Sequence, residues 1–99
     1  MLAALDAEFR FSLDVAADRI NHCCSRCFTS VEDGLRQDWG TERRWCNPPY
    51  GRRIREWVAK ACEAAQRGAT VVCLIPARTC TSWWRDYCLK GEVRYTVVA

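Results

Sequence analysis

The sequence has no run of about 18 or more apolar residues, which is the length that a helix needs to cross a membrane. It has no cleavable apolar stretch near its start either, because Asp6 and Glu8 come directly after the first five residues. Internal repeats and low-complexity segments are also absent. We therefore expect a cytoplasmic protein that makes no contact with a membrane.

The composition is that of one small folded domain over residues 1–99, because 49% of the residues are hydrophobic. A chain of this length buries roughly 60 to 65% of the surface that its unfolded form exposes, so its core is modest. Eight cysteines would indicate a disulfide framework in a secreted chain, but without a secretion signal we expect reduced thiols. The net charge of +3 is too small to identify a nucleic-acid partner.

Strands and helices alternate in the pattern of apolar residues. From Ile54 to Ala65 apolar residues recur at intervals of three and four, which predicts a helix. Ala69 to Ile75 is a continuous β-branched apolar run, which predicts a strand buried on both faces. The other expected elements are a helical piece within residues 2–9, strands at Phe11 to Val15, Arg44 to Cys46 and Glu92 to Val98, and a helix that begins at Thr81 or Ser82. This order predicts an α/β fold with a mainly parallel sheet and flanking helices, a partial Rossmann-like arrangement.

The remaining apolar residues are assigned mainly to the core. Trp83 and Trp84 are adjacent on a predicted helix and cannot both face inward, so one is expected at the surface. Between Asp18 and Gly40 the periodicity fails, and we expect irregular structure there, with or without a short strand near Arg26 to Thr29. The cysteines expected in strands and helices as small apolar residues are Cys46, Cys62, Cys73, Cys80 and Cys88.

Asn47-Pro48-Pro49-Tyr50 carries the clearest chemistry. Two prolines end a strand, so the tetrapeptide is expected at a strand tip, where ligands bind in open α/β sheets. The Asn47 carboxamide oxygen and the Pro48 carbonyl can each accept a hydrogen bond from an exocyclic amine, and Tyr50 offers a face for stacking. This combination suits methyl transfer to the amino group of a base, although a simple turn is the alternative.

Two further strand tips carry polar residues. Asp14 follows the first strand, and a carboxylate there is costly to bury without a partner. No glycine-rich loop comes after it, but Ala16 is small enough to permit close approach of a ligand. Arg78 follows the strand that Pro76 ends, and its guanidinium could bind a phosphate or a carboxylate. Arginines also flank the tetrapeptide, as a phosphate-contacting rim or as a solvated surface: Arg36, Arg43, Arg44, Arg52, Arg53 and Arg55.

The chain resembles the phage-type DNA N6-adenine methyltransferases over nearly all of its length. Several blocks match in the same order and spacing, which is more specific than one motif. They are Leu5-Asp6-Ala7-Glu8-Phe9, Phe11-Ser12-Leu13-Asp14-Val15-Ala16-Ala17, Asp33-Gly34-Leu35, Asp38-Trp39, Trp45-Cys46-Asn47-Pro48-Pro49-Tyr50-Gly51, Leu74-Ile75-Pro76-Ala77-Arg78-Thr79 and Trp83-Trp84.

The resemblance implies an S-adenosylmethionine-dependent enzyme, encoded by a phage or prophage, that methylates a flipped adenine in double-stranded DNA in the bacterial cytoplasm. No metal is implied. The implied site residues are Asn47, Pro48, Pro49 and Tyr50 for catalysis, Asp14, Ala16, Asp33 and Asp38 for the cofactor, and Arg52, Arg53 and Arg78 for DNA. The family's Trp and Thr-Pro segment and its later Gly-Arg turn have no counterpart here, so we expect a chain truncated at both ends.

Two alternatives stay open. His22, Cys23, Cys24 and Cys27 lie close enough in sequence to suggest a zinc-stabilised nucleic-acid-binding module without catalysis, although no second ligand pair stands at a matched spacing. The other alternative is an inactive methyltransferase fragment, because a small core leaves little stability in reserve.

Overall fold

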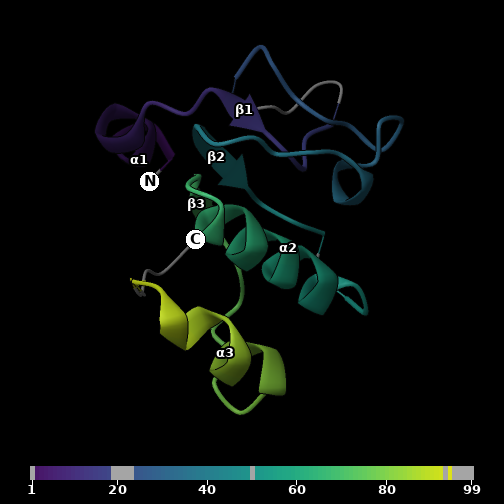
Figure 1. The fold of residues 1–99 in the computed structure, drawn as a ribbon, viewed down its shortest axis with the longest axis vertical. Coiled ribbons are helices and arrows are strands. Elements are labelled where there is room, and N and C mark those ends of the chain that lie inside the picture. The colour runs from purple at the N-terminus through teal and green to yellow at the C-terminus, as the bar shows by residue number, and fades with distance from the viewer. Residues whose placement is uncertain (1, 19–23, 50, 93, 95–99) are drawn as a thin grey trace.

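The protein was analysed as a computed structural model that describes residues 2–18, 24–49, 51–92 and 94. Three parallel strands form its sheet: β1 (Leu13–Asp14), β2 (Arg43–Cys46) and β3 (Thr70–Cys73), in that spatial order (Figure 1). With helices beside this sheet, the predicted α/β fold with a mainly parallel sheet is confirmed.

A further segment pairs with the outer side of β1. Cys27 forms a parallel bridge with Asp14. The N–H of Asp14 donates to the Arg26 carbonyl at 3.1 Å, and the N–H of Phe28 donates to the Asp14 carbonyl at 2.8 Å. Val15 donates its N–H to Trp45 on the opposite side, at 3.0 Å. The short strand considered near Arg26 to Thr29 is therefore present as a single bridge.

Helix α2 (Ile54–Gln66) connects β2 to β3 and covers one face of the sheet. Trp57, Ala61 and Ala64 share a core cluster with residues of the three strands. The helix ends before Gly68, whose φ of 107° lies in the left-handed region that glycine adopts most readily. The helical periodicity thus predicts the element and most of its buried residues, but Ala64 is buried where Ala65 is expected.

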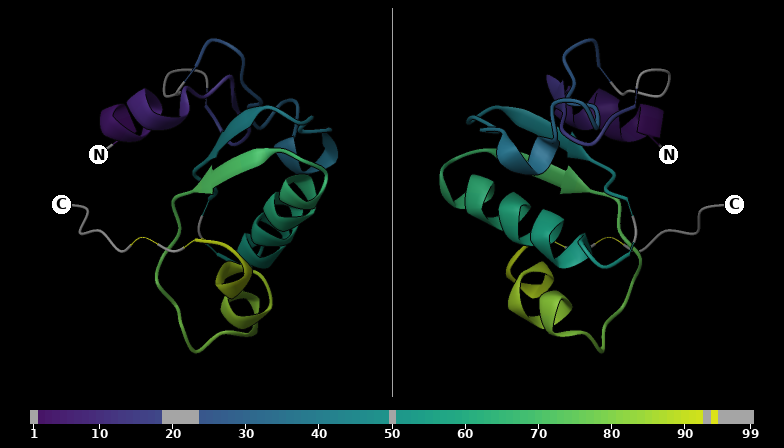
Figure 2. Two further views of the ribbon diagram at one scale, coloured as in Figure 1. Left: turned by 60° about the vertical axis from the view of Figure 1, so that its left-hand side comes forward. Right: turned by 90° about the vertical axis from the view of Figure 1, so that its right-hand side faces the viewer.

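Helix α1 (Leu2–Phe9) lies on the far side of the strands from α2 in both views of Figure 2. The 3₁₀ helix η1 (Gly34–Arg36) instead contacts α2. Trp45 packs against Phe11, with ring centroids 5.4 Å apart. Neighbouring side chains of a strand point to opposite faces, so Trp45 lies on the face away from Cys46 and α2.

Both tryptophans of α3 (Ser82–Asp86) are buried, so the expectation that one is exposed is wrong. Both side chains lie in one apolar cluster, and their rings meet edge to face with centroids 6.2 Å apart. They pack against Ile54 and Val58, the outward-facing apolar residues of α2. The Thr81 hydroxyl caps α3 as predicted, and the 3₁₀ helix η2 (Cys88–Lys90) follows.

Three other expectations need correction or lie outside the structure. β3 is half-buried rather than buried on both faces, because it is the last strand of the described sheet and α2 covers one side. Cys80 is exposed in a loop and is not part of the core. Of the predicted strand Glu92 to Val98, only Glu92 and Arg94 are described. No described helix is long and apolar enough to cross a bilayer.

Candidate active site at the strand tips

The ends of β1 and β2 bring the Asp14 loop and the tetrapeptide close together. Asp14 is the register partner of Trp45, and Asn47 comes two residues after Trp45. Both segments leave the same edge of the sheet because the two strands are parallel. Two of the sequence-predicted groups are thus adjacent in space although 33 residues separate them in the chain.

The direction in which the chain moves across the sheet changes between these two strands. From β1 it passes to the bridge at Cys27 on one side, and it then returns to β2 on the other side. Ligands of open α/β sheets bind beyond the carboxyl ends of strands at such a reversal point. The Asp14 loop and Asn47 therefore flank the position that the fold favours for a ligand.

The Asp14 carboxylate is enclosed by the fold. Its residue is 4% exposed, and its Oδ1 accepts a hydrogen bond from the N–H of Ala16 at 3.2 Å. Ala16 is partly buried and packs against the core cluster. This bond fixes the turn that follows β1, so the strand tip and its carboxylate form a rigid unit.

The tetrapeptide combines a fixed proline with an accessible carboxamide. Pro48 is buried, whereas Asn47 and Pro49 are exposed. Asn47 makes no side-chain hydrogen bond to another described residue, and its carboxamide is therefore available to a ligand. Tyr50 lies outside the described residues.

Asp33 lies at the start of η1, which packs against the tip of β1. Its φ is 55°, and its Oδ1 accepts a hydrogen bond from the N–H of Leu35 at 3.3 Å. Its Oδ2 lies 3.7 Å from Nε of Arg36. Gly34 is buried against Val15, so Asp33 is held beside the loop that contains Asp14.

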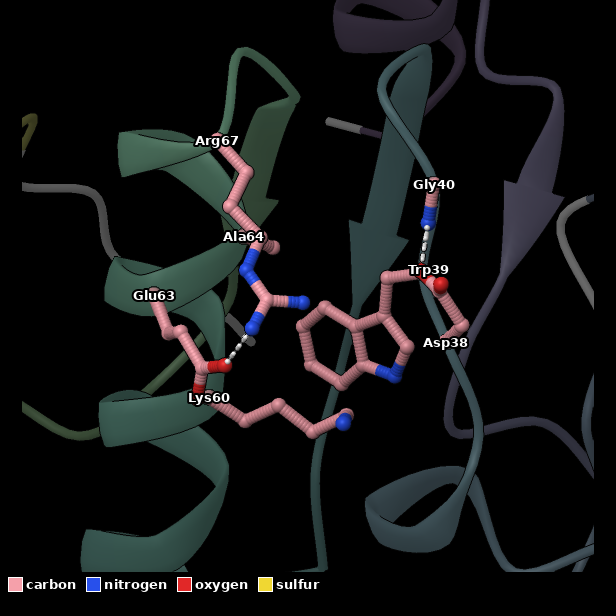
Figure 3. Close-up of a pocket in the computed structure, with 7 residues that line it drawn as sticks. All are labelled: Asp38, Trp39, Gly40, Lys60, Glu63, Ala64 and Arg67. Atoms are coloured by element: carbon pink, nitrogen blue, oxygen red, sulfur yellow. Dashed lines mark hydrogen bonds and ion pairs between the residues drawn. The ribbon is translucent and has the colours of Figure 1, made fainter.

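Asp38 is not brought to the strand tips. Its Oδ1 accepts a hydrogen bond from the N–H of Gly40 at 2.8 Å, in the turn that leads into β2. Figure 3 shows Asp38 near the last turns of α2, where Glu63 and Arg67 form an ion pair at 2.8 Å. The cavity there has a volume of about 30 Å³, which is room for about one water molecule and not for a nucleoside.

A wider groove lies between η1 and α2. Its volume is about 310 Å³ and it is open to solvent. Its lining carries both signs of charge and consists of Leu35, Arg36, Arg53, Glu56, Ala59, Lys60 and Glu63. The Arg53 guanidinium lies 2.8 Å from Glu56, and this hydrogen-bonded pair raises the pKa of Arg53. The groove therefore begins at Arg53, at the start of α2, and continues along the helix.

The arginines around the tetrapeptide serve different purposes. Arg52 and Arg78 are exposed, and their side chains make no hydrogen bond or ion pair to another described residue. Arg55 instead joins α2 to α3, bonding Ser82 at 2.9 Å and Asp86 at 3.3 Å. Arg55 therefore has a structural contact, whereas Arg52 and Arg78 are exposed.

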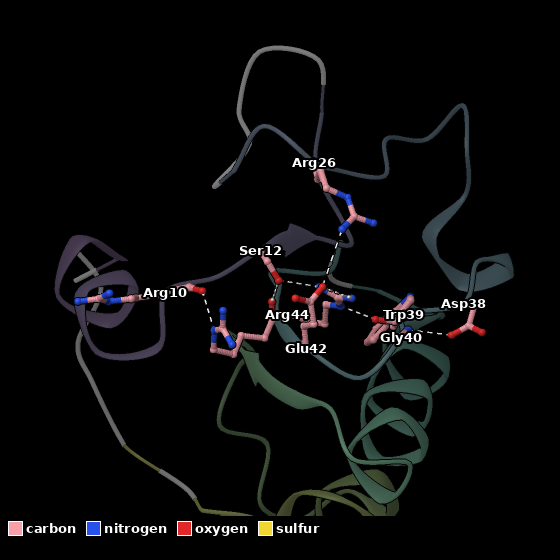
Figure 4. Close-up of polar contacts among 9 residues, drawn as sticks. Arg10, Ser12, Arg26, Asp38, Trp39, Gly40, Glu42 and Arg44 are labelled. Carbon is pink, nitrogen blue, oxygen red and sulfur yellow. Dashed lines mark hydrogen bonds and ion pairs between the residues drawn. The ribbon is translucent and has the colours of Figure 1, made fainter.

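Arg44 differs from the exposed arginines near the tetrapeptide because it is buried. It donates hydrogen bonds to the Trp39 carbonyl and, at 2.8 Å, to the Ser12 hydroxyl, while Glu42 lies 3.7 Å away (Figure 4). Burial lowers the pKa of Arg44, opposed by the charge of Glu42. Arg44 therefore stabilises the start of β2 and takes no part in the site.

The zinc hypothesis gains no ligand set from the described residues. In that part of the chain, no group of three or more His, Cys, Asp or Glu side chains is arranged to hold a metal ion. Cys24 and Cys27 are partly buried, whereas His22 and Cys23 lie outside the described residues. Cys46 is fully buried in the core, where a hydrogen bond with Cys73 and burial raise the pKa of its thiol.

Comparison with known proteins identifies the family. The family model described as DNA N-6-adenine-methyltransferase (Dam) matches residues 1–96. The chain belongs to this family. The Dam assignment confirms the resemblance that the separate sequence blocks indicate.

A DNA N-6-adenine-methyltransferase of Escherichia phage T1 is 30% identical to the chain over 88 residues. This Dam relative is matched over 87% of the present chain and 37% of its own length, so the chain spans just over a third of it. No solved structure matches the chain significantly. Asp33-Gly34-Leu35 is one of the blocks on which the resemblance rests, but the packing of Gly34 against Val15 is visible only in the structure.

Proposed function

We propose that the chain forms the catalytic part of an S-adenosylmethionine-dependent DNA adenine-N6 methyltransferase that acts on double-stranded DNA in the bacterial cytoplasm. The observation that carries this proposal is the adjacency of two strand tips. One holds the buried Asp14 carboxylate and the other holds the exposed Asn47 carboxamide, on either side of the reversal point of the sheet. Family membership supports the same reaction.

The groups at the tip of β1 suit the proposed cofactor. S-adenosylmethionine carries an ammonium group, ribose hydroxyls and a sulfonium, and all of these are favoured by carboxylates. Asp14 supplies one carboxylate at the strand tip, and Asp33 supplies a second beside it. Ala16 leaves room for close approach. When bound, the cofactor supplies a methyl group that the sulfonium already makes reactive.

The tetrapeptide supplies what the amine of adenine needs. We assign the Asn47 oxygen and the Pro48 carbonyl to accept the two N6 hydrogens, which leaves the nitrogen lone pair free to attack the methyl group. The nitrogen becomes positively charged as its bond to carbon forms, so both acceptors bind the transition state more tightly than the substrate. We assign Tyr50 to stack against the base after it leaves the duplex.

Arginines are assigned to the DNA backbone. Arg52 follows the tetrapeptide and Arg78 follows β3, and both side chains are exposed. Arg53 follows Arg52 and is the N-cap residue of α2. Guanidinium groups bind phosphates through two parallel hydrogen bonds, so this edge of the protein can hold the duplex while a base is extruded.

The test is incubation of this chain with methyl-labelled S-adenosylmethionine and unmethylated duplex DNA, with digestion to nucleosides. Label in N6-methyladenine is the expected result. The matched control is Asn47→Ala, which should bind the cofactor and form product about 10² to 10³ times more slowly. A chain that binds neither the cofactor nor DNA would contradict the proposal, as would label on cytosine.

A further inference from the structure

The segment that carries Asp33 packs against β1 without any room for a side chain at position 34. A Cβ atom placed on Gly34 would lie 2.0 Å from the carbonyl oxygen of Val15 and 3.0 Å from Cη2 of Trp57. Carbon and oxygen atoms in van der Waals contact are more than 3 Å apart. Any side chain here must therefore displace η1 from the strand by about 1 Å.

Neither neighbour can move away readily. Val15 is fully buried and its N–H bonds to Trp45, so its carbonyl is fixed in the sheet. Trp57 belongs to the face of α2 that packs on the core. Displacement is therefore expected in η1 rather than in the strand or in α2.

A hydrogen bond holds Gly34 in place from the opposite direction. The indole Nε1–H of Trp39 donates to the Gly34 carbonyl at 2.8 Å, in a buried environment. Trp39 is 2% exposed, and its ring centroid lies 6.2 Å from that of Trp57. Gly34 is thus fixed on one side by the tip of β1 and on the other by the Trp39 indole.

We propose that Gly34 is a positioning residue, which sets the separation of Asp33 from the Asp14 loop and thereby the affinity for S-adenosylmethionine. The inference rests on the proposed function, because it assigns both carboxylates to the cofactor. The contact between Gly34 and Val15 links the two carboxylates, because Asp33 directly precedes Gly34 and Asp14 directly precedes Val15. A displacement of η1 alters the distance between the carboxylates directly. The Asn47 segment follows a different strand and is not displaced.

Gly34→Ala tests this inference, with Gly91→Ala as the matched control. A Cβ on Gly91 meets Cys88 at 3.9 Å, an ordinary contact, so that variant should bind the cofactor like the parent chain. In Gly34→Ala, a misplacement of about 1 Å should weaken cofactor binding, and raise the KM for the cofactor, by about tenfold to a hundredfold. Affinity for duplex DNA should stay unchanged in both variants. A folded Gly34→Ala chain with parental cofactor affinity would overturn the inference.

If Gly34→Ala fails to fold, Trp39→Phe is the second test of the inference. It removes the hydrogen bond to the Gly34 carbonyl and adds no atoms between η1 and the strand. Weaker cofactor binding by about threefold or more, with unchanged DNA affinity, is expected from losing one buried hydrogen bond at this position. Unchanged affinity overturns the inference. Failure of the proposed function looks different, because the parent chain itself would then bind no S-adenosylmethionine.

Discussion

Asp14 lies opposite Trp45 in the parallel pairing of β1 with β2, and the N–H of Val15 donates to the Trp45 carbonyl at 3.0 Å. This register determines how the proposed site is assembled. A shift of one residue would turn the Asp14 carboxylate to the other face of the sheet. It would also change the distance from the Asp14 loop to Asn47.

Replacement of Asn47 by alanine should reduce the rate of methyl transfer by about 10² to 10³, by analogy with the loss of one oxyanion-hole donor. Cofactor affinity should change little, because the carboxamide acts on the amine of the base. Single-turnover rates and equilibrium titration with S-adenosylmethionine measure the two effects separately. Gln66→Ala is the control, since this exposed carboxamide is at the far end of α2. Equal turnover in the two variants would exclude the assigned role.

Arg52→Ala and Arg78→Ala should each weaken DNA binding for all sequences alike, and each should reduce the dependence of log affinity on log salt by about one. Both side chains are exposed and make no ion pair to another described residue, so little folding stability should be lost. Arg67→Ala is the control, because Arg67 pairs with Glu63 at the opposite end of α2. Salt titrations by fluorescence anisotropy give the slopes, and parental slopes in both variants would remove these arginines from the interface.

Local patterns in the sequence predict much of this fold. The three-and-four spacing from Ile54 predicts α2, and the two prolines after Asn47 predict that β2 ends before them. Thr81 is recognisable as a helix cap because its hydroxyl can bond a free N–H of the first turn. Each of these features depends on interactions within a few residues, which sequence patterns report well.

Features that depend on contacts between distant parts of the chain are harder to predict from the sequence. The burial of both Trp83 and Trp84 depends on the outer face of α2, and the half-exposure of β3 depends on its place at the end of the described sheet. Asp38 is placed by its turn near the last residues of α2, a position that its spacing from Asp33 does not predict. Tertiary packing decides these cases, and local periodicity does not encode it.

Replacement of Arg44 by alanine should destabilise the protein by about 2 to 4 kcal/mol, because the buried Trp39 carbonyl would lose its donor and a cavity would remain. Urea denaturation followed by tryptophan fluorescence measures the change. The exposed Arg26, whose ion pair with Glu42 has a distance of 4.0 Å, provides the control. Arg26→Ala should cost less than about 1 kcal/mol. A similar cost in both variants would contradict a structural role for Arg44.

The thiol of Cys88 should resist alkylation at neutral pH when the protein is folded. Burial raises the pKa of Cys88 to about 11 from its usual 9.0, with smaller contributions from Cys73 and Cys62. The thiolate is the reactive form, so native Cys88 should react with iodoacetamide only as the pH approaches 11. In urea the same residue should react at a lower pH, because the pKa of its thiol returns to the usual 9.0.

Folding favours the neutral thiol of Cys88. Its contribution to stability is therefore fully present below the pKa of the thiol in the unfolded chain, and it is lost as the pH rises through the pKa in the folded protein. Exposed Cys80 provides the internal reference, and mass spectrometry of both peptides across this pH range reports the two rates. Native Cys88 that is alkylated as fast as Cys80 at pH 8 would show that the η2 segment does not shield it.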